Sequence, residues 1–191
     1  MAKKVVVKKT VKKKAIPFEE LSKPEQRVAI AKDVIKHLNT GKIKATVGTY
    51  FENSFIDKHL YKLSDENKNV ELQTLLEKDD VKCKVCALGG MFVVDVLNND
   101  HLLVGKKERD IDSYLERKRL KKYFSTSQLS LIENSFEKMN IVDPTSNNWS
   151  VNYDGVEFGK KFKSPKDRLI AIMQNVIDNK GTFIPPKTNQ E

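Results

Sequence analysis

The stretch CKVCALGGMFVVDVL, residues 83–97, is the most apolar part of this 191-residue chain. Its apolar residues leave almost no polar face, and a helix that is apolar all round is a buried one. Gly89 and Gly90 would each cost such a helix about 1 kcal/mol relative to alanine, which indicates close backbone packing against a neighbour. Because Val93, Val94 and Val96 are β-branched, a buried strand over residues 91–97 is the competing assignment. We expect a buried helix here, at the centre of the fold.

Helix start signals predict further helices on both sides of this centre. Ser22-Lys23-Pro24-Glu25 is a capping box with proline at the first helical position, and it predicts a helix over about residues 24–39. The motifs that begin at Ser125 (STSQ) and Ser164 (SPKD) are similar, and apolar residues follow each at helical spacing. Residues 108–124 and 67–78 carry the same spacing without such a cap.

Strand signals are fewer. Apolar and polar residues alternate from Ile43 to Phe51, which indicates a strand. Asp154-Gly155 lies between VNY (residues 151–153) and VEF (residues 156–158), the pattern of a two-residue β-hairpin. The order of elements does not alternate strand and helix. We therefore predict a helix-dominated α+β fold, with about five helices around a buried central helix and a small antiparallel β-hairpin or sheet.

The charge of the chain is concentrated at its N-terminus. Residues 1–14 contain seven lysines and no acid, which accounts for +7 of the net charge of +9 and leaves 28 basic against 26 acidic residues elsewhere. The lysines are Lys3, Lys4, Lys8, Lys9, Lys12, Lys13 and Lys14. We predict a disordered arm over residues 1–17, because this Lys/Val tract buries too little surface to offset the entropy of ordering. Residues 18–184 are predicted to form one globular domain, followed by a C-terminal tail over residues 185–191.

An arm of this kind predicts contact with nucleic acid or another polyanion through residues 1–14. Lysines neutralise phosphates and release counterions, which gives sequence-blind and salt-sensitive binding. The arm has no aromatic residue on which a base could stack, so base readout is not expected from it. A solvated tail without a specific partner is the open alternative. A second basic run, residues 117–122, is interpreted as the solvated face of a helix.

Cys83 and Cys86 form a C-x-x-C motif with three interpretations. A structural zinc site needs four ligands, and the three histidines lack the usual H-x₃₋₅-H pairing. Alternatively, Cys86 is a nucleophile at a helix N-terminus, with His101 as its base and Asp95 or Asp100 as the orienting acid. The interpretation we favour is that both cysteines are small core residues. We therefore assign no catalytic residue, metal or cofactor.

Two further features concern a buried charge and a group of aromatic residues. Asp95 is a lone charge in the apolar stretch, and since a buried charge needs a partner, Arg117 or Arg168 is expected to supply one. The aromatic residues around the expected hairpin, beside nearby lysines, are candidates for a ligand- or strand-binding surface, although such a hairpin more often caps a core. Its candidate ligand-binding residues are Trp149, Tyr153, Phe158 and Lys160.

The element C-x-x-C-A-L-G-G-x-F, residues 83–92, resembles uncharacterised small proteins encoded by tailed phages. RVAIAKD (residues 27–33), DRLIAIMQN (residues 167–175) and GTFIP (residues 181–185) resemble the same group, so the resemblance covers most of residues 25–185. It implies a viral accessory or virion-associated protein, located in the host cytoplasm or in the virion. Because the group has no assigned activity, the resemblance implies no site residues.

Three classes of function remain after these observations. The first is a non-enzymatic phage accessory or virion-associated protein, whose body docks on a protein partner or on itself while the arm holds a polyanion. The second is a defence-countering protein that sequesters a nucleotide-like ligand or blocks a host factor. The third is a cysteine-dependent enzyme that uses Cys86. No membrane association is expected, because no run approaches the roughly 18 apolar residues that a membrane span needs.

Overall fold

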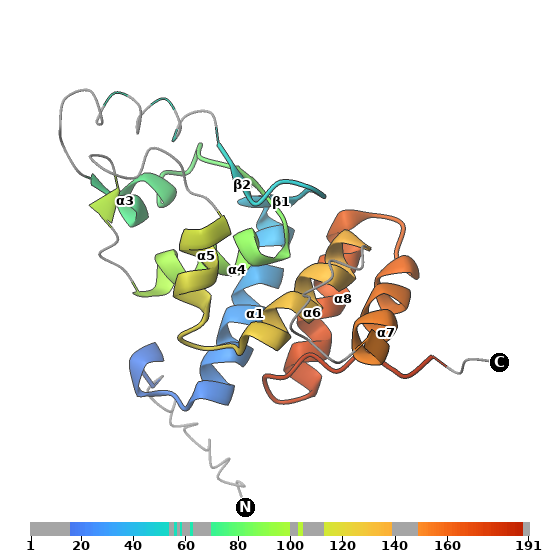
Figure 1. Cartoon of the computed structure of the whole chain (residues 1–191). Coiled ribbons are helices and arrows are strands. Elements are labelled where there is room, and N and C mark those ends of the chain that lie inside the picture. The colour runs from blue at the N-terminus through green and yellow to red at the C-terminus, as the bar shows by residue number, and fades with distance from the viewer. Residues whose placement is uncertain are drawn as a thin grey trace, which may run out of the picture.

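The structure, a computed structural model, describes residues 16–53, 56, 58, 62, 70–99, 103–104, 113–138 and 149–188. Its α-helices are α1 (Lys23–Thr40), α3 (Leu72–Leu76), α4 (Ala87–Asn99), α5 (Ser113–Leu120), α6 (Thr126–Glu137), α7 (Trp149–Lys160) and α8 (Pro165–Asp178). A short 3₁₀ helix, η1 (Phe18–Glu20), precedes α1. The strands are β1 (Ile43–Ala45), β2 (Phe51–Glu52), β3 (Val70–Glu71), β4 (Cys83–Val85) and β5 (Leu103–Val104). The helix-dominated α+β fold is confirmed (Figure 1).

The sheet is small and mixed. β4 lies in its centre, where it pairs in parallel with β1 and antiparallel with β2. β3 and β5 form a separate antiparallel pair. The strand expected over Ile43–Phe51 is divided, because the chain turns at Gly48, whose φ of 73° lies in the left-handed region.

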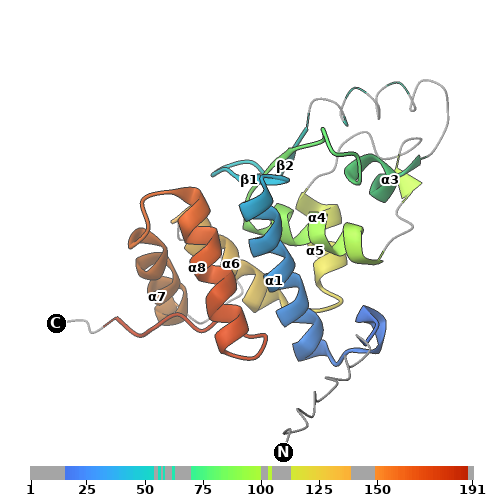
Figure 2. The same ribbon diagram turned by 180° about the vertical axis from the view of Figure 1, so that it is seen from behind.

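The central apolar stretch forms a strand and then the expected buried helix. Residues 83–85 are β4, and α4 begins at Ala87 and continues to Asn99, so the strand assignment for residues 91–97 is wrong. Leu88, Phe92 and Val94 are fully buried. α4 contacts α1, α3, α5 and α6, which together cover it (Figures 1 and 2). The surrounding helices therefore exclude water from α4, as its composition predicts.

Gly89 explains how α4 meets the sheet. A Cβ atom at Gly89 would lie 1.6 Å from the carbonyl oxygen of Tyr50, while one at Gly90 would make only ordinary contacts at 3.6 Å and beyond. The backbone at Tyr50 therefore approaches the first turn of α4 so closely that residue 89 must be glycine, whereas residue 90 has room for a Cβ atom.

The predicted hairpin at Asp154-Gly155 is wrong, because residues 149–160 form helix α7. Gly155 and Gly159 lie one turn apart and share the face that packs against α6. A Cβ at Gly159 would lie 1.9 Å from the carbonyl oxygen of Ser135, and one at Gly155 would lie 2.6 Å from the Ser135 hydroxyl. These glycines permit close helix packing rather than a turn, so tertiary contact outweighs the local turn preference.

The three predicted helix caps are present. In the capping box of α1, the Ser22 amide donates to the Glu25 carboxylate at 2.9 Å. Ser125 accepts from the Gln128 amide at 3.2 Å, and Ser164 accepts from the Asp167 amide at 3.0 Å. α1 and α8 then run side by side in opposite directions (Figure 2).

Residues 182–188 follow α8 in an extended conformation along the body. Phe183 is 1% exposed, and its backbone amide and carbonyl both bond to the side-chain amide of Gln128. The Asn175 side chain holds the backbone of Ile184 in the same way. The hydroxyl and amide of Thr188 both donate to Asp154. Phe183 and Ile184 thus bond to α6 and α8, and the predicted tail is held to α7 through Thr188.

Candidate functional site

α5 is held to the body by charged groups. The Arg119 guanidinium donates to the carboxylate of Asp95 at 2.8 Å, and the Tyr123 hydroxyl donates to the other oxygen of that carboxylate at 2.7 Å. Asp95 is fully buried in α4. Its partner is therefore Arg119 rather than Arg117 or Arg168, and these two bonds satisfy the lone charge that the sequence places in the apolar stretch.

A second arginine of α5 forms an ion pair with a glutamate of α6. Arg117 donates to the buried carboxylate of Glu133 in α6, and the Tyr50 hydroxyl donates to the same carboxylate at 2.6 Å. Burial and the neighbouring Glu133 charge raise the pKa of Tyr50, so this hydroxyl keeps its proton. The sequence signal for Glu133 is its position four residues after Leu129, on the apolar face of α6, and our sequence interpretation missed it.

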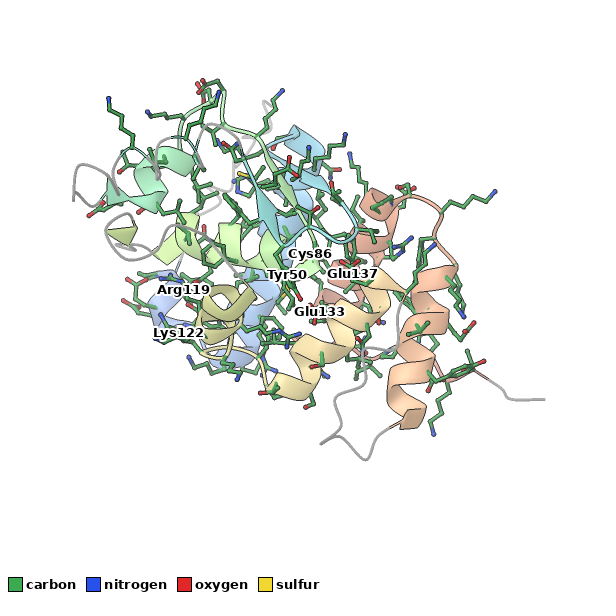
Figure 3. The ribbon with its side chains drawn as sticks, turned by 45° about the horizontal axis from the view of Figure 1, so that its top comes forward. Tyr50, Cys86, Arg119, Lys122, Glu133 and Glu137 are labelled. Atoms are coloured by element: carbon green, nitrogen blue, oxygen red, sulfur yellow. The ribbon has the colours of Figure 1, made fainter. Side chains whose placement is uncertain are left out.

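One turn after Glu133, Glu137 anchors the loop between β1 and β2. Its carboxylate accepts from the backbone amide of Gly48 at 2.9 Å. Burial raises the pKa of Glu137 above its ordinary value, and the Gly48 hydrogen bond opposes that rise. In Figure 3, Glu133 and Glu137 point from α6 toward the region of Tyr50 and Cys86.

Arg168 bonds to backbone carbonyls near the ends of two helices rather than to Asp95. This buried side chain donates to the backbone carbonyls of Phe136, Gly159 and Phe162. Phe136 and Gly159 lie in the last turns of α6 and α7, where helix geometry leaves carbonyls without intrahelical donors, and Phe162 lies two residues after α7. Arg168 therefore joins two helix ends and is not available to Asp95.

The outer side of α5 and of the turn after it presents lysines. Lys118, Lys121 and Lys122 are exposed, whereas Arg117 and Arg119 bond to the buried carboxylates of Glu133 and Asp95. The basic run that we interpreted as one solvated face is thus divided into two inward arginines and three outward lysines.

Phe18, the first residue of the predicted body, lies against the turn that follows α5. The Phe18 ring packs edge-on against the Tyr123 ring, with centroids 5.7 Å apart, and the Gln26 side chain donates to the Phe18 carbonyl at 3.0 Å. Lys23 Nζ lies 5.2 Å from the centroid of the Tyr123 ring. Arg27 lies 5.9 Å from the Phe124 ring. The seven arm lysines themselves, and with them the predicted disorder of residues 1–15, lie outside the described residues.

The cysteines are built into the core. Cys83 lies in β4 and Cys86 just before α4, and they are 1% and 2% exposed. The Gly89 amide donates to the Cys86 sulfur at 3.4 Å. In the part of the chain that the structure describes, no three His, Cys, Asp or Glu side chains gather as a metal site would need. This burial agrees with the interpretation of the cysteines as core residues.

The partners expected for a nucleophilic Cys86 do not come together in the described residues. Asp95 lies nine residues farther along α4, roughly 13 Å along the helix axis, and its carboxylate is bound to Arg119. Asp100 and His101 lie outside the described residues. Of the two candidate orienting acids, the one that the structure describes, Asp95, holds α5.

The aromatic candidates whose side chains the structure describes differ in their surroundings. Tyr153 is 40% exposed on α7, while Phe158 packs against Phe162 and Phe183 at ring distances of 5.3 and 5.6 Å. Lys160 bonds to Glu157 at 2.6 Å. Trp149 begins α7. With the hairpin replaced by a helix, Phe158 contributes to the core rather than to a ligand surface.

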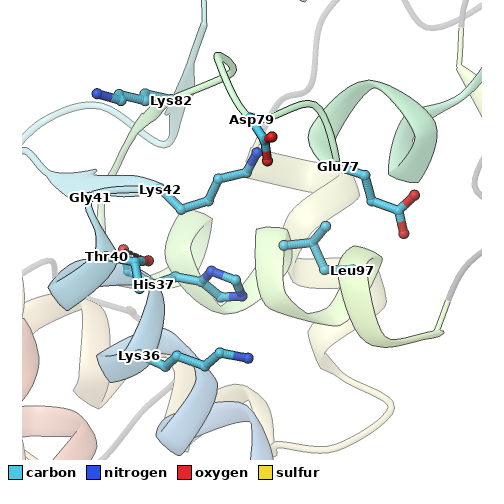
Figure 4. Close-up of a pocket in the computed structure, with 9 residues that line it drawn as sticks. All are labelled: Lys36, His37, Thr40, Gly41, Lys42, Glu77, Asp79, Lys82 and Leu97. Atoms are coloured by element: carbon cyan, nitrogen blue, oxygen red, sulfur yellow. Dashed lines mark hydrogen bonds between the residues drawn. The ribbon is translucent and has the colours of Figure 1, made fainter.

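A pocket of about 420 Å³ lies at the C-terminal end of α1 (Figure 4). Its lining combines three lysines and a histidine with two carboxylates. The lining residues are Lys36, His37, Thr40, Gly41, Lys42, Glu77, Asp79, Lys82 and Leu97. Burial, reinforced by Lys36 and Lys42, lowers the pKa of His37. None of these lining residues is phenylalanine, tyrosine or tryptophan, so they offer a nucleotide base no such ring for stacking.

Comparison with known proteins gives no relative: no protein-family model, curated protein or solved structure matches the chain. No helix among the described residues is both long enough and apolar enough to cross a membrane.

Proposed function

We propose that this chain is a non-enzymatic nucleic-acid-binding protein, whose N-terminal arm contacts the phosphate backbone while its body presents the arm and docks on a protein partner. The observation that carries the proposal is the concentration of seven lysines, without an acid, in residues 1–14. The contacts of Phe18 with Gln26 and Tyr123 support it, because they fix the point from which the arm extends.

The expected mode of binding follows from the residue type. Lysine is a point charge that neutralises phosphates without reading sequence. If each arm lysine neutralises one phosphate of a duplex, the logarithm of the binding constant falls with the logarithm of salt concentration with a slope of about −6. In the viral setting that the resemblance implies, such sequence-blind binding suits a protein that accompanies a genome.

The test compares the full chain with a full-length variant in which all seven arm lysines are glutamine. Affinity for a duplex oligonucleotide, a single-stranded one and heparin is measured by fluorescence anisotropy or competition across about 50 to 200 mM salt. We expect the variant to lose most of the slope and at least a hundredfold in affinity at the low-salt end. Equal affinity and equal salt slope in both proteins would show that the arm lysines do not bind the nucleic acid. Tighter binding to heparin than to either oligonucleotide would contradict a nucleic-acid partner.

A further inference from the structure

We infer that a nucleic acid held by the arm also lies across the turn between α5 and α6, where a second group of cations faces solvent. This inference rests on the proposed function. The group, which we name the turn patch, consists of Lys118, Lys121 and Lys122 with Lys23 and Arg27 of α1.

The first argument is that the arginines of α5 are paired inside the body, while Lys118 and the lysines after the helix face solvent. Arg117 and Arg119 are bound by the carboxylates of Glu133 and Asp95, so their charges are offset inside the body. These two ion pairs fix the orientation of α5, which holds Lys118 and the two lysines after the helix on the outside. A rigidly placed cation loses less entropy on binding a phosphate than one on a mobile segment does.

The second argument is position. The Phe18–Tyr123 contact places the start of the body directly beside the end of α5. Both views show η1 next to the connection between α5 and α6 (Figures 1 and 2). Fifteen residues span at most about 50 Å when extended. The arm and the turn patch are therefore able to neutralise adjacent phosphates of one strand or duplex.

Exposed acidic residues of η1 and α1 restrict where a nucleic acid can lie on this part of the surface. Glu19 and Glu20 are exposed on η1, and Glu25 is exposed at the start of α1. Hydrogen bonds from Ser22 lower the pKa of Glu25, so it stays ionised. A phosphate backbone is repelled by these carboxylates and is steered toward the lysines of the turn. Removing the charges of Glu19 and Glu20 should therefore tighten binding.

The experiment uses two full-length triple variants that remove the same charge from different places. The first is Lys118→Gln, Lys121→Gln and Lys122→Gln. The matched control is Lys161→Gln, Lys163→Gln and Lys166→Gln, all exposed and located around the connection between α7 and α8, away from η1 and α5 (Figure 1). Salt-dependent affinity for a duplex oligonucleotide is measured for both, together with Glu19→Gln/Glu20→Gln.

We expect the turn variant to flatten the salt slope by about 2 to 3, which corresponds to three lost phosphate contacts, while the control changes it by less than about 1. The turn variant should bind at least tenfold more weakly at low salt, and the Glu19→Gln/Glu20→Gln variant should bind more tightly than the unchanged protein. Circular dichroism confirms folding; if the triple variant is unfolded, Lys122→Gln alone should flatten the slope by about 1.

The inference fails if both triple variants lose the same affinity, which would indicate a net-charge effect, or if neither changes the slope. Either result leaves the arm hypothesis standing as long as the arm variant has lost its slope. Absence of nucleic-acid binding by the unchanged protein would instead overturn the proposed function itself.

Discussion

At the scale of single residues, two buried carboxylates decide how α5 is held. Asp95→Asn keeps the shape of the side chain but removes the negative charge that is paired with Arg119, a largely buried cation. Breaking a buried ion pair in this way costs about 3 to 5 kcal/mol. We expect the free energy of unfolding, measured by urea denaturation, to fall by about 3 kcal/mol.

An exposed pair provides the control for that measurement. Lys84 and Glu52 are bonded at 2.7 Å across β4 and β2, and both side chains are about half exposed. Because exposed pairs contribute at most about 1 kcal/mol, Glu52→Gln should have a small effect. Equal decreases in the free energy of unfolding for the two variants would show that burial does not make one ion pair more important for stability than the other.

Glu137 should make stability depend on pH. Burial raises its folded-state pKa above the unfolded value near 4.5, so the folded protein binds this proton more tightly. The resulting stabilisation is fully present below the unfolded pKa and is lost as pH rises through the folded pKa. Glu137→Gln keeps an acceptor for the Gly48 amide but does not titrate. The unfolding free energy of the variant minus that of the unchanged protein should therefore increase as pH rises; a difference independent of pH would contradict this.

At the scale of elements, the neighbouring glycines Gly89 and Gly90 allow the packing of α4 to be tested. Gly89→Ala would place a Cβ 1.6 Å from the Tyr50 carbonyl, and relief of that overlap requires the backbone to move. Overpacking typically costs about 1 to 3 kcal/mol, and we expect at least the upper figure here. Gly90→Ala meets only ordinary contacts, so it should be neutral or stabilise the helix by up to about 1 kcal/mol. Thermal unfolding of both variants checks the contrast, and equal melting temperatures would contradict the packing argument.

The elements also show what the sequence can and cannot predict. Ser22, Ser125 and Ser164 mark helix starts correctly because a cap is local: the side chain bonds to an amide three residues away or less. Gly155 misleads because the contact that requires it, with Ser135, is distant in sequence. A turn motif and a helix-packing motif use the same residue, and only the partner helix decides between them.

The candidate site also has one part that the sequence predicts and one part that it does not. The arm is visible in composition alone, because charge density is a property of the segment itself. The turn patch is not, since it depends on which basic side chains of α5 turn inward. That choice is made by Asp95 and Glu133, which lie on two other helices. Pairing between distant residues therefore separates structural arginines from lysines that face solvent.

At the scale of the whole molecule, residues 182–188 act as a strap across the C-terminal helices. Gln128 of α6, Asn175 of α8 and Asp154 of α7 each bond to this segment. An extended chain has no internal hydrogen bonds, so these side chains take the place of a neighbouring strand. The strap contributes stability mainly through Phe183, whose ring lies against Phe158.

Substitution of two adjacent strap residues tests this role. Phe183→Ala removes a side chain that is 1% exposed and should lower the free energy of unfolding by about 3 to 5 kcal/mol. Ile184→Ala removes one that is 53% exposed, and its cost should stay below about 1 kcal/mol because little apolar surface leaves water there. Urea denaturation of both variants measures the difference. A small effect of Phe183→Ala would mean that α6, α7 and α8 hold together without the strap, and that the body is complete at the end of α8.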